Sequence, residues 1–154
     1  MEIFDLTTSK VSDTLTVDEG VFLSAAYSRD GRLLATGYTR KNWFGVLLWD
    51  TATKKVIHRC GGATYFARTL AFTPDDKFVL TYSGTDADEV GTVTVWSVAS
   101  GKLVEAFNVG NGGGERFALS PDGNTLVTLG YNGTLRRWDF AAIRKEFEAK
   151  AEKK

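Results

Sequence analysis

The hydrophobic residues of this chain fall into short runs that recur in a fixed order and are separated by turn signals. One kind of run combines alanine with large side chains and precedes a turn, at 25–27, 70–72 and 117–119. A second kind follows the same turn and is almost continuously apolar, at 33–36, 78–81 and 125–128. Short apolar runs bounded by turns are typical of buried β-strands. Because no segment before residue 140 has the period of a long amphipathic helix, the pattern predicts an all-β fold.

The turn between the two kinds of run has a sequence that repeats three times. It reads Ser-Arg-Asp-Gly at 28–31, Thr-Pro-Asp-Asp at 73–76 and Ser-Pro-Asp-Gly at 120–123. Proline in the second position presets φ for a type I turn, and Gly or Asp tolerates the conformation that follows. Each pair of runs is therefore expected to form an antiparallel hairpin with a tight turn.

An aromatic residue marks a further strand in each repeat and gives the repeat its length. Trp49, Trp96 and Trp138 lie 47 and 42 residues apart, and Phe4 fills the same slot 45 residues before Trp49. An interval of this length, with Trp-Asp at the end of a strand, is the spacing of a four-stranded β-propeller blade. We therefore expect these four aromatic side chains to be buried at equivalent positions of successive blades.

Three motifs resemble the WD40 repeat family over residues 2 to about 139. They are Ser-Pro-Asp-Gly at 120–123, Leu-Leu-Ala-Thr-Gly at 33–37 and Asn-Gly-Thr-Leu-Arg-Arg-Trp-Asp at 132–139. The end of the chain, from Trp138, is also similar to the ends of bacterial WD40 proteins, where the propeller finishes in a short helix. The family's Gly-His is missing before every inner strand, and the Asp of its later turn survives only as Asn132. The resemblance thus implies that the family's side-chain tetrad cannot form as usual and that blade stability depends on apolar packing.

The repeats predict a partial propeller of about three four-stranded antiparallel blades with a leading half-blade. We expect the half-blade at 1–17, blades at 18–62, 63–109 and 110–139, and a helical tail at 140–154. In this tail Ile143 and Phe147 lie four residues apart and share a helix face. Propellers close with four to eight blades, so this repeat number leaves open edges that must be covered. The chain is expected to form a homodimer, or to pair with a chain supplying the missing blades, or to be the second half of a longer propeller.

Composition narrows the possible partners and the compartment. Nineteen basic residues balance nineteen acidic ones, which removes the electrostatic footprint of a nucleic-acid or anionic-membrane binder. No stretch approaches the ~20 apolar residues of a membrane span. Cys60 is the only cysteine, so no intrachain disulfide can form and a cytoplasmic location is favoured. We accordingly expect a protein partner, and neither nucleic acid nor membrane.

No arrangement of residues in the sequence points to catalysis, a cofactor or a metal. His58 and Cys60 offer two ligands where a structural zinc site needs four, and no Gly-x-Ser-x-Gly is present to support a hydrolase triad. The glycine-rich stretch 110–114 lacks the Gly-Lys-Ser/Thr of a phosphate-binding loop. We therefore expect the chain not to be an enzyme.

The candidate binding residues lie in the connections between the second and third strands. In the WD40 family these connections lie with the outer-to-inner loops on one face, the top face, which commonly binds partners. The connections 38–45 and 84–91 are long, and Trp and Arg are enriched at binding hot spots. The residues expected to bind a partner are Arg40, Lys41, Trp43, Phe44, Asp86, Asp88, Glu89 and Tyr131.

Two alternatives stay open at this point. Trp43 and Phe44 either contact a partner or fold back onto their own blade. As for function, the chain is expected to be a non-catalytic protein–protein interaction scaffold that uses the top face and the open blade edges. The alternative is a regulatory or structural domain, or a fragment, of a larger multidomain enzyme.

Overall fold

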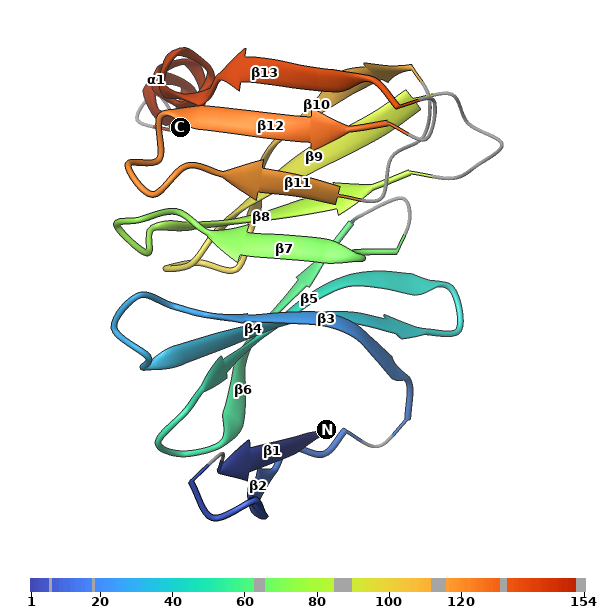
Figure 1. The fold of residues 1–154 in the computed structure, drawn as a ribbon, viewed down its shortest axis with the longest axis vertical. Coiled ribbons are helices and arrows are strands. Elements are labelled where there is room, and N and C mark those ends of the chain that lie inside the picture. The colour runs from blue at the N-terminus through green and yellow to red at the C-terminus, as the bar shows by residue number, and fades with distance from the viewer. Residues whose placement is uncertain are drawn as a thin grey trace.

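The computed structural model describes residues 1–5, 7–17, 19–62, 66–84, 90–111, 116–130 and 133–151. Within these residues the chain forms four antiparallel sheets followed by one helix (Figure 1). This is the architecture of a partial β-propeller, and it confirms the all-β fold class predicted from the repeats.

Each sheet is a simple up-and-down meander. The leading sheet contains β1 (Glu2–Asp5) and β2 (Lys10–Thr14). The second contains β3 (Val21–Tyr27), β4 (Leu33–Arg40), β5 (Trp43–Asp50) and β6 (Lys55–Gly61). The third contains β7 (Thr69–Phe72), β8 (Phe78–Ser83), β9 (Val90–Ser97) and β10 (Leu103–Asn111). The last contains β11 (Arg116–Leu119), β12 (Thr125–Leu129) and β13 (Leu135–Asp139).

The sheets follow one another in chain order, from β1–β2 at the lower end of Figure 1 to β11–β13 at its upper end. Their inner strands β3, β7 and β11 are neighbours. The three tight turns predicted from the sequence all lie at the left of Figure 1, and the β4–β5 turn lies at the right, on the top face. Successive repeats therefore place equivalent residues side by side.

The register of the strands puts the three tryptophans at one common position. Trp49 pairs with Leu34, Trp96 with Val79 and Trp138 with Leu126. Trp49 and Trp96 are 2% and 0% exposed, whereas Trp138 is half-buried. The Phe4 side chain lies outside the described part of the structure, so its equivalence stays a prediction.

A hydrogen bond anchors the indole of each of these three tryptophans, buried at Trp49 and Trp96 and partly buried at Trp138. The indole Nε1 donates to a threonine Oγ1 of the neighbouring strand, over 3.0 Å in Trp49–Thr36, 3.2 Å in Trp96–Thr81 and 3.0 Å in Trp138–Thr128. A buried N–H without an acceptor would lower the free energy of unfolding. The threonine hydroxyl supplies that acceptor, so the indole can be buried without this cost. One side-chain hydrogen bond per sheet thus adds to the apolar packing on which the blades were expected to depend.

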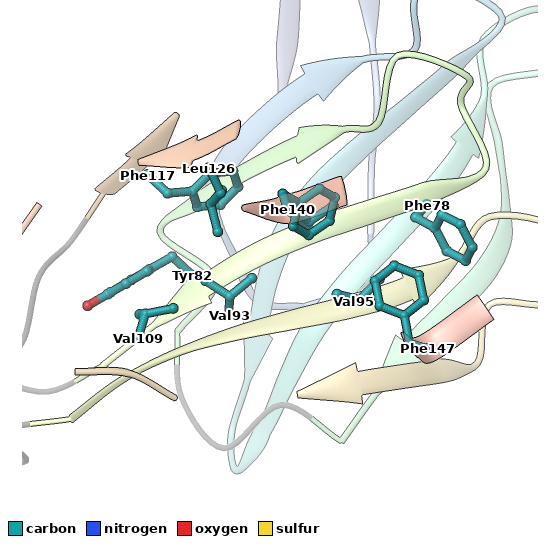
Figure 2. Packing of buried hydrophobic residues seen from close by; sticks show 10 residues of the cluster. Phe78, Tyr82, Val93, Val95, Val109, Phe117, Leu126, Phe140 and Phe147 are labelled. Atoms are coloured by element: carbon teal, nitrogen blue, oxygen red, sulfur yellow. The ribbon is translucent and has the colours of Figure 1, made fainter. Parts of the chain in front are cut away.

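The hydrophobic core is divided into clusters that lie between successive sheets. Leu15, Leu34 and Trp49 join the leading sheet to the second. Val46, Leu48 and Trp96 join the second to the third. Figure 2 shows the cluster between the third sheet, the last sheet and the helix. Each tryptophan therefore packs toward the sheet that precedes its own.

The chain ends in helix α1 (Phe140–Ala151), as the sequence predicted. The helix begins directly after β13, where the Asp139 carboxylate accepts a hydrogen bond from the Ala142 N–H over 3.0 Å, as an N-cap does. Phe140 and Phe147 are fully buried, and Phe147 meets the Phe78 ring edge-on at 5.1 Å (Figure 2). Ile143 packs against the same cluster. Since α1 packs on the third and last sheets, β13 pairs only with β12 among the described strands.

The expected long connection at 38–45 is wrong. Strand β4 continues to Arg40 and β5 starts at Trp43, so that only Lys41 and Asn42 form the turn. Lys41 has a φ of 53°, which suits a two-residue hairpin turn. Aromatic residues such as Trp43 and Phe44 favour extended backbone, and this preference lengthens the hairpin.

Candidate protein-binding surfaces

Trp43 packs on its own sheet. Its indole lies 5.8 Å from the Tyr38 ring and covers the backbone of Gly45 and Gly61, where an added Cβ would come within 2.8 Å of the indole. Only glycine at these two positions lets the indole lie flat on the strands. Of the two interpretations left open for Trp43, the geometry supports packing on the blade.

Phe44 points to the opposite face of the sheet and forms the centre of a small aromatic cluster. Its ring meets Phe66 edge-on at 5.0 Å, and the Arg68 guanidinium lies 5.8 Å from the Phe66 centroid. Phe66 remains exposed. Sequence reasoning missed Phe66 and Arg68, although an aromatic-basic run between an outer and an inner strand is a signal that could have identified them.

The charged residues of the top face are only partly placed. Arg40 forms an exposed ion pair with Glu19, in which Nη2 and Oε2 are 2.8 Å apart. Lys41 lies exposed in the β4–β5 turn. Asp86, Asp88, Glu89 and Tyr131 lie outside the described residues. Arg40 and Lys41 are therefore exposed at the β4–β5 turn, and their grouping with the other four residues stays a prediction.

Two sheet faces, at opposite ends of the array, carry exposed apolar side chains. On the second sheet Tyr27 is 50% exposed, whereas the residues at the same register position, Phe72 and Leu119, pack against interior clusters. The difference arises because a preceding four-stranded sheet covers Phe72, while only the two strands β1 and β2 precede the second sheet. Tyr27 thus marks a place where two strands of a preceding blade would lie.

The outer face of the last sheet is the second uncovered surface. Leu129 and Leu135 pair across β12 and β13 and are 48% and 65% exposed. The residues that match Leu135, three positions before the tryptophan, are Val46 and Val93, and both are fully buried by a following sheet. Phe117 and Leu126 of the same sheet instead point inward and are buried. In a run that is apolar on both faces, the sequence alone does not reveal which side chains point outward.

Arg137 is the charged exception on this outer face. It is exposed, and it holds the position of Leu48 and Val95, which are fully buried. It makes no ion pair with any residue in the part of the chain that the structure describes. A surface that covers this face must therefore accommodate a cation among apolar side chains.

The tight turns are held by a side-chain network of their own. Ser28 Oγ donates to the Asp30 carboxylate over 2.8 Å and accepts from the Leu33 N–H over 2.9 Å. The same bonds recur from Thr73 and from Ser120. The backbone N–H of Arg32, its guanidinium and the Ser28 hydroxyl together lower the pKa of Asp30 to about 2. These aspartates thus fix the turns that contact neighbouring sheets.

Cys60 and His58 are placed apart from any candidate chemistry. Cys60 is fully buried, and desolvation raises the pKa of its thiol to about 11. His58 lies on the outer strand β6 beside Gly101. In the described ranges, no group of three or more His, Cys, Asp or Glu side chains is arranged to hold a metal ion. Over the same ranges there is also no helix with the length and apolar character needed to cross a bilayer.

A partial β-propeller of repeated four-stranded sheets is thus the class that this fold defines. Its last repeat, residues 116–139, matches the family described as WD domain, G-beta repeat. Repeats of this family generally mediate protein–protein interaction. The match covers strands β11 to β13, including the Trp138–Thr128 pair.

Comparison with known proteins extends the likeness over most of the chain. It is 33% identical over 121 residues to cilia- and flagella-associated protein 52 of Macaca fascicularis, covering 74% of this chain and 20% of that protein. It is 30% identical over 118 residues to protein groucho of Drosophila melanogaster, covering 75% of this chain and 15% of the relative. A third relative is the periodic tryptophan protein 2 homolog of Dictyostelium discoideum, 26% identical over 123 residues, with 79% and 13% covered. The chain therefore spans a fifth or less of these relatives, and none of the three supports the expected bacterial character.

Proposed function

We propose that this chain is a non-catalytic protein-interaction domain built throughout from WD40-type blades. The observation that carries the proposal is the exposure of Tyr27, Leu129 and Leu135 at positions where the counterparts in the other repeats are buried or partly buried. Covering such apolar area is worth roughly 25 cal/mol per Å², and an unpaired strand edge beside it invites a further strand. The blades that we propose are 18–62, 63–109 and 110–139, with the half-blade 1–17 before them and the tail 140–154 after them. The proposed location is the cytoplasm.

A second candidate function rests on the relatives. Because each is at least five times as long as the segment it shares with this chain, the chain can also serve as a regulatory or structural part of a larger protein. In that case the covering blades belong to the same protein, and the surfaces described above are internal junctions. Both candidates assign these surfaces to protein contacts; they differ in whether the contact is made by a separate chain.

The top face contributes a smaller proposed surface. Phe44, Phe66 and Arg68 form an aromatic-basic cluster in which Phe66 and Arg68 are exposed, and Arg40 and Lys41 are exposed at the β4–β5 turn. Aromatic and arginine side chains are the usual anchors of protein interfaces. The proposal extends to Asp86, Asp88, Glu89 and Tyr131 on the strength of their sequence positions alone.

The test is quantitative capture from extracts of the source cell with the tagged chain as bait. Leu129→Ser with Leu135→Ser should reduce captured protein at least tenfold, because the outer face of the last sheet loses its apolar contacts. Ile57→Ser is the matched control, since Ile57 is exposed to a similar extent on the outer strand β6. Thermal unfolding of every variant verifies that the fold is kept.

Two outcomes would count against the proposed surfaces. Unchanged capture by the Leu129→Ser, Leu135→Ser variant would remove the outer face from the interface. Loss of capture with Phe44→Ala alone would instead assign binding to the top face.

A further inference from the structure

The tight turns of neighbouring sheets contact one another through two fixed positions. At the junction of the second and third sheets, the backbone N–H of Arg29 donates to the Asp76 carboxylate, at 2.9 Å and 3.1 Å from its two oxygens. Arg29 is the second residue of its turn and Asp76 is the fourth residue of the next turn. The second position of one turn therefore lies against the fourth position of the following turn.

The next junction uses the same two positions with a different pair of residues. Pro74, in second position, packs on Gly123, in fourth position, so closely that a Cβ added to Gly123 would come within 2.8 Å of the proline Cδ. Proline has no N–H, so a carboxylate opposite it would have no donor. Glycine leaves the space that the proline ring occupies. The second position of one turn and the fourth position of the next turn thus form one of two pairs. Either a backbone N–H meets a carboxylate, or a proline packs on a glycine.

The first and the last of the three turns each leave one of these two positions without a partner turn. The last turn carries Pro121 in second position, and it is exposed where its counterpart Pro74 is half-buried. The first turn carries Gly31 in fourth position, and no atom lies within 4 Å of a Cβ added there. Gly31 is exposed, whereas its counterpart Gly123 is buried. The unmatched proline and the unmatched glycine form the pair already used between Pro74 and Gly123.

We propose that a second copy of this chain places its β11–β13 sheet in front of the β3–β6 sheet, with its Pro121 packed on Gly31. This inference rests on the proposed function, because it names the partner of the two uncovered faces. The same contact repeated about a two-fold axis joins both ends of both copies. Two copies then contribute three blades each, and a ring of six blades lies within the four to eight that propellers use.

The uncovered residues find partners in this arrangement. At the interior junction, Leu80 and Ala71 lie in the cluster that contains Leu119. Val127 and Ala118 hold the positions of Leu80 and Ala71 in the last sheet, and Tyr27 holds the position of Leu119. In the dimer, Val127 and Ala118 of one copy therefore lie over Tyr27 of the other. Arg137 holds the position of Leu48, which shares a cluster with Trp96. It therefore faces Trp49 of the other copy once β1 is displaced, because Ile3 of β1 packs on the cluster that contains Trp49. A guanidinium can then stack on the indole by a cation–π contact.

The leading strands explain how the fourth strand of the shared blade is supplied. Strand β1 holds the third position of its blade, as β13 does, because Phe4 pairs with Val11 in the register in which Trp49 pairs with Val56. The docked sheet keeps β13, which its Trp138–Thr128 bond and the buried Phe140 hold in place. Strand β2 of one copy then pairs with the free edge of β13 of the other copy, and β13 displaces β1 from the third position.

The test exchanges one kind of turn pair for the other. Light scattering on the full chain at micromolar concentration should give about 34 kDa, twice the 16.9 kDa of one chain. Gly31→Asp places a carboxylate against Pro121 and should raise the dissociation constant of the dimer about tenfold, measured by sedimentation. Adding Pro121→Arg restores a backbone N–H opposite that carboxylate, as between Arg29 and Asp76, and should recover most of the loss.

A matched control separates this contact from a general effect of the substitution. Gly62→Asp also replaces an exposed glycine of positive φ with open space around it, but on the top face. It should leave the dissociation constant unchanged. A monomer at micromolar concentration would overturn the proposal, and so would a dimer in which the double variant binds no better than Gly31→Asp alone. A monomer that still captures a protein through Leu129 and Leu135 would leave the proposed function standing.

Discussion

The tryptophan and threonine side chains define the repeat at the level of single residues. Each indole is fixed at one end by packing toward the preceding sheet and at the other by a threonine hydroxyl. The threonines lie 13, 15 and 10 residues before their tryptophans. This interval changes with the length of the turn between the strands, so no fixed spacing in the sequence identifies the pair. Only the strand register brings the two side chains together.

Thr81→Val tests the contribution of one such pair. Valine keeps the shape of threonine but leaves the Trp96 Nε1 buried without an acceptor, which should lower the free energy of unfolding by about 1–3 kcal/mol. Urea unfolding followed by tryptophan fluorescence measures the change. Thr92→Val on strand β9 is the control, because its hydroxyl bond to Asn108 is exposed, and it should change stability by less than about 0.5 kcal/mol. Equal effects of the two variants would show that the Trp96 bond contributes nothing specific.

At the scale of elements, helix α1 follows the third strand in chain order, where the other blades have an outer strand, but it does not pair with the edge of β13. The change follows from composition: the tail has alternating charges with Phe140, Ile143 and Phe147 spaced for a helix face, and no β-branched run. The helix covers the end of the third sheet, where Arg144 Nη2 lies 2.5 Å from Asp75 Oδ2 and its guanidinium stacks on Phe78. The helix thereby links the last two sheets to each other and leaves β13 open.

Phe147→Ala should destabilise the protein by about 3–5 kcal/mol, the usual cost of removing a buried aromatic ring. The cause is the cavity left against Phe78 and Phe140, both of which contact the Phe147 ring. Thermal unfolding by circular dichroism measures the loss. Glu146→Ala, one residue away and exposed, should be nearly neutral. If both variants unfold at the wild-type temperature, α1 does not hold the last two sheets together.

The elements were easier to predict from the sequence than the surfaces. Turn motifs located the three turns between the first and second strands, and the spacing of Ile143 and Phe147 located the helix, since each depends on residues close in the chain. The connection at 38–45 was mispredicted because Trp43 and Phe44 continue the strands, so that Lys41 and Asn42 are left to make the turn. The sequence did not identify Leu129 and Leu135 as outward-facing, because a run that is apolar on both faces has no period. The turn pairs, such as Arg29 with Asp76, join residues 47 positions apart. They could not be predicted from the sequence, because only the fold brings these residues together.

At the scale of the whole molecule, the two ends of the array are complementary. Among the strands that the structure describes, the first sheet has two, β1 and β2, and the last sheet has three, ending at β13. In the proposed dimer the β11–β13 sheet of one copy and strands β1 and β2 of the other copy form one shared blade. Strands β13 and β1 would both occupy the third position of that blade, so one of them is in excess. The leading strand β1 should then be dispensable, whereas β2 should not.

Two N-terminal deletions test this difference. Removing residues 2–9 takes away β1 but keeps β2 (Lys10–Thr14), and it should leave the dimer intact or strengthen it, because β1 no longer competes with β13 of the other copy. Removing residues 2–17 also takes away β2 and Leu15, which is buried against Leu34 and Trp49. This should raise the dissociation constant at least tenfold, since the shared blade loses its fourth strand and the open edge of β13 has no partner. Sedimentation over a range of concentrations measures both constants, and circular dichroism verifies that the remaining sheets are folded. If the shorter deletion dissociates the dimer as completely as the longer one, β1 and not β13 forms the third strand at the interface. A chain that is monomeric before and after both deletions would exclude strand pairing between copies altogether.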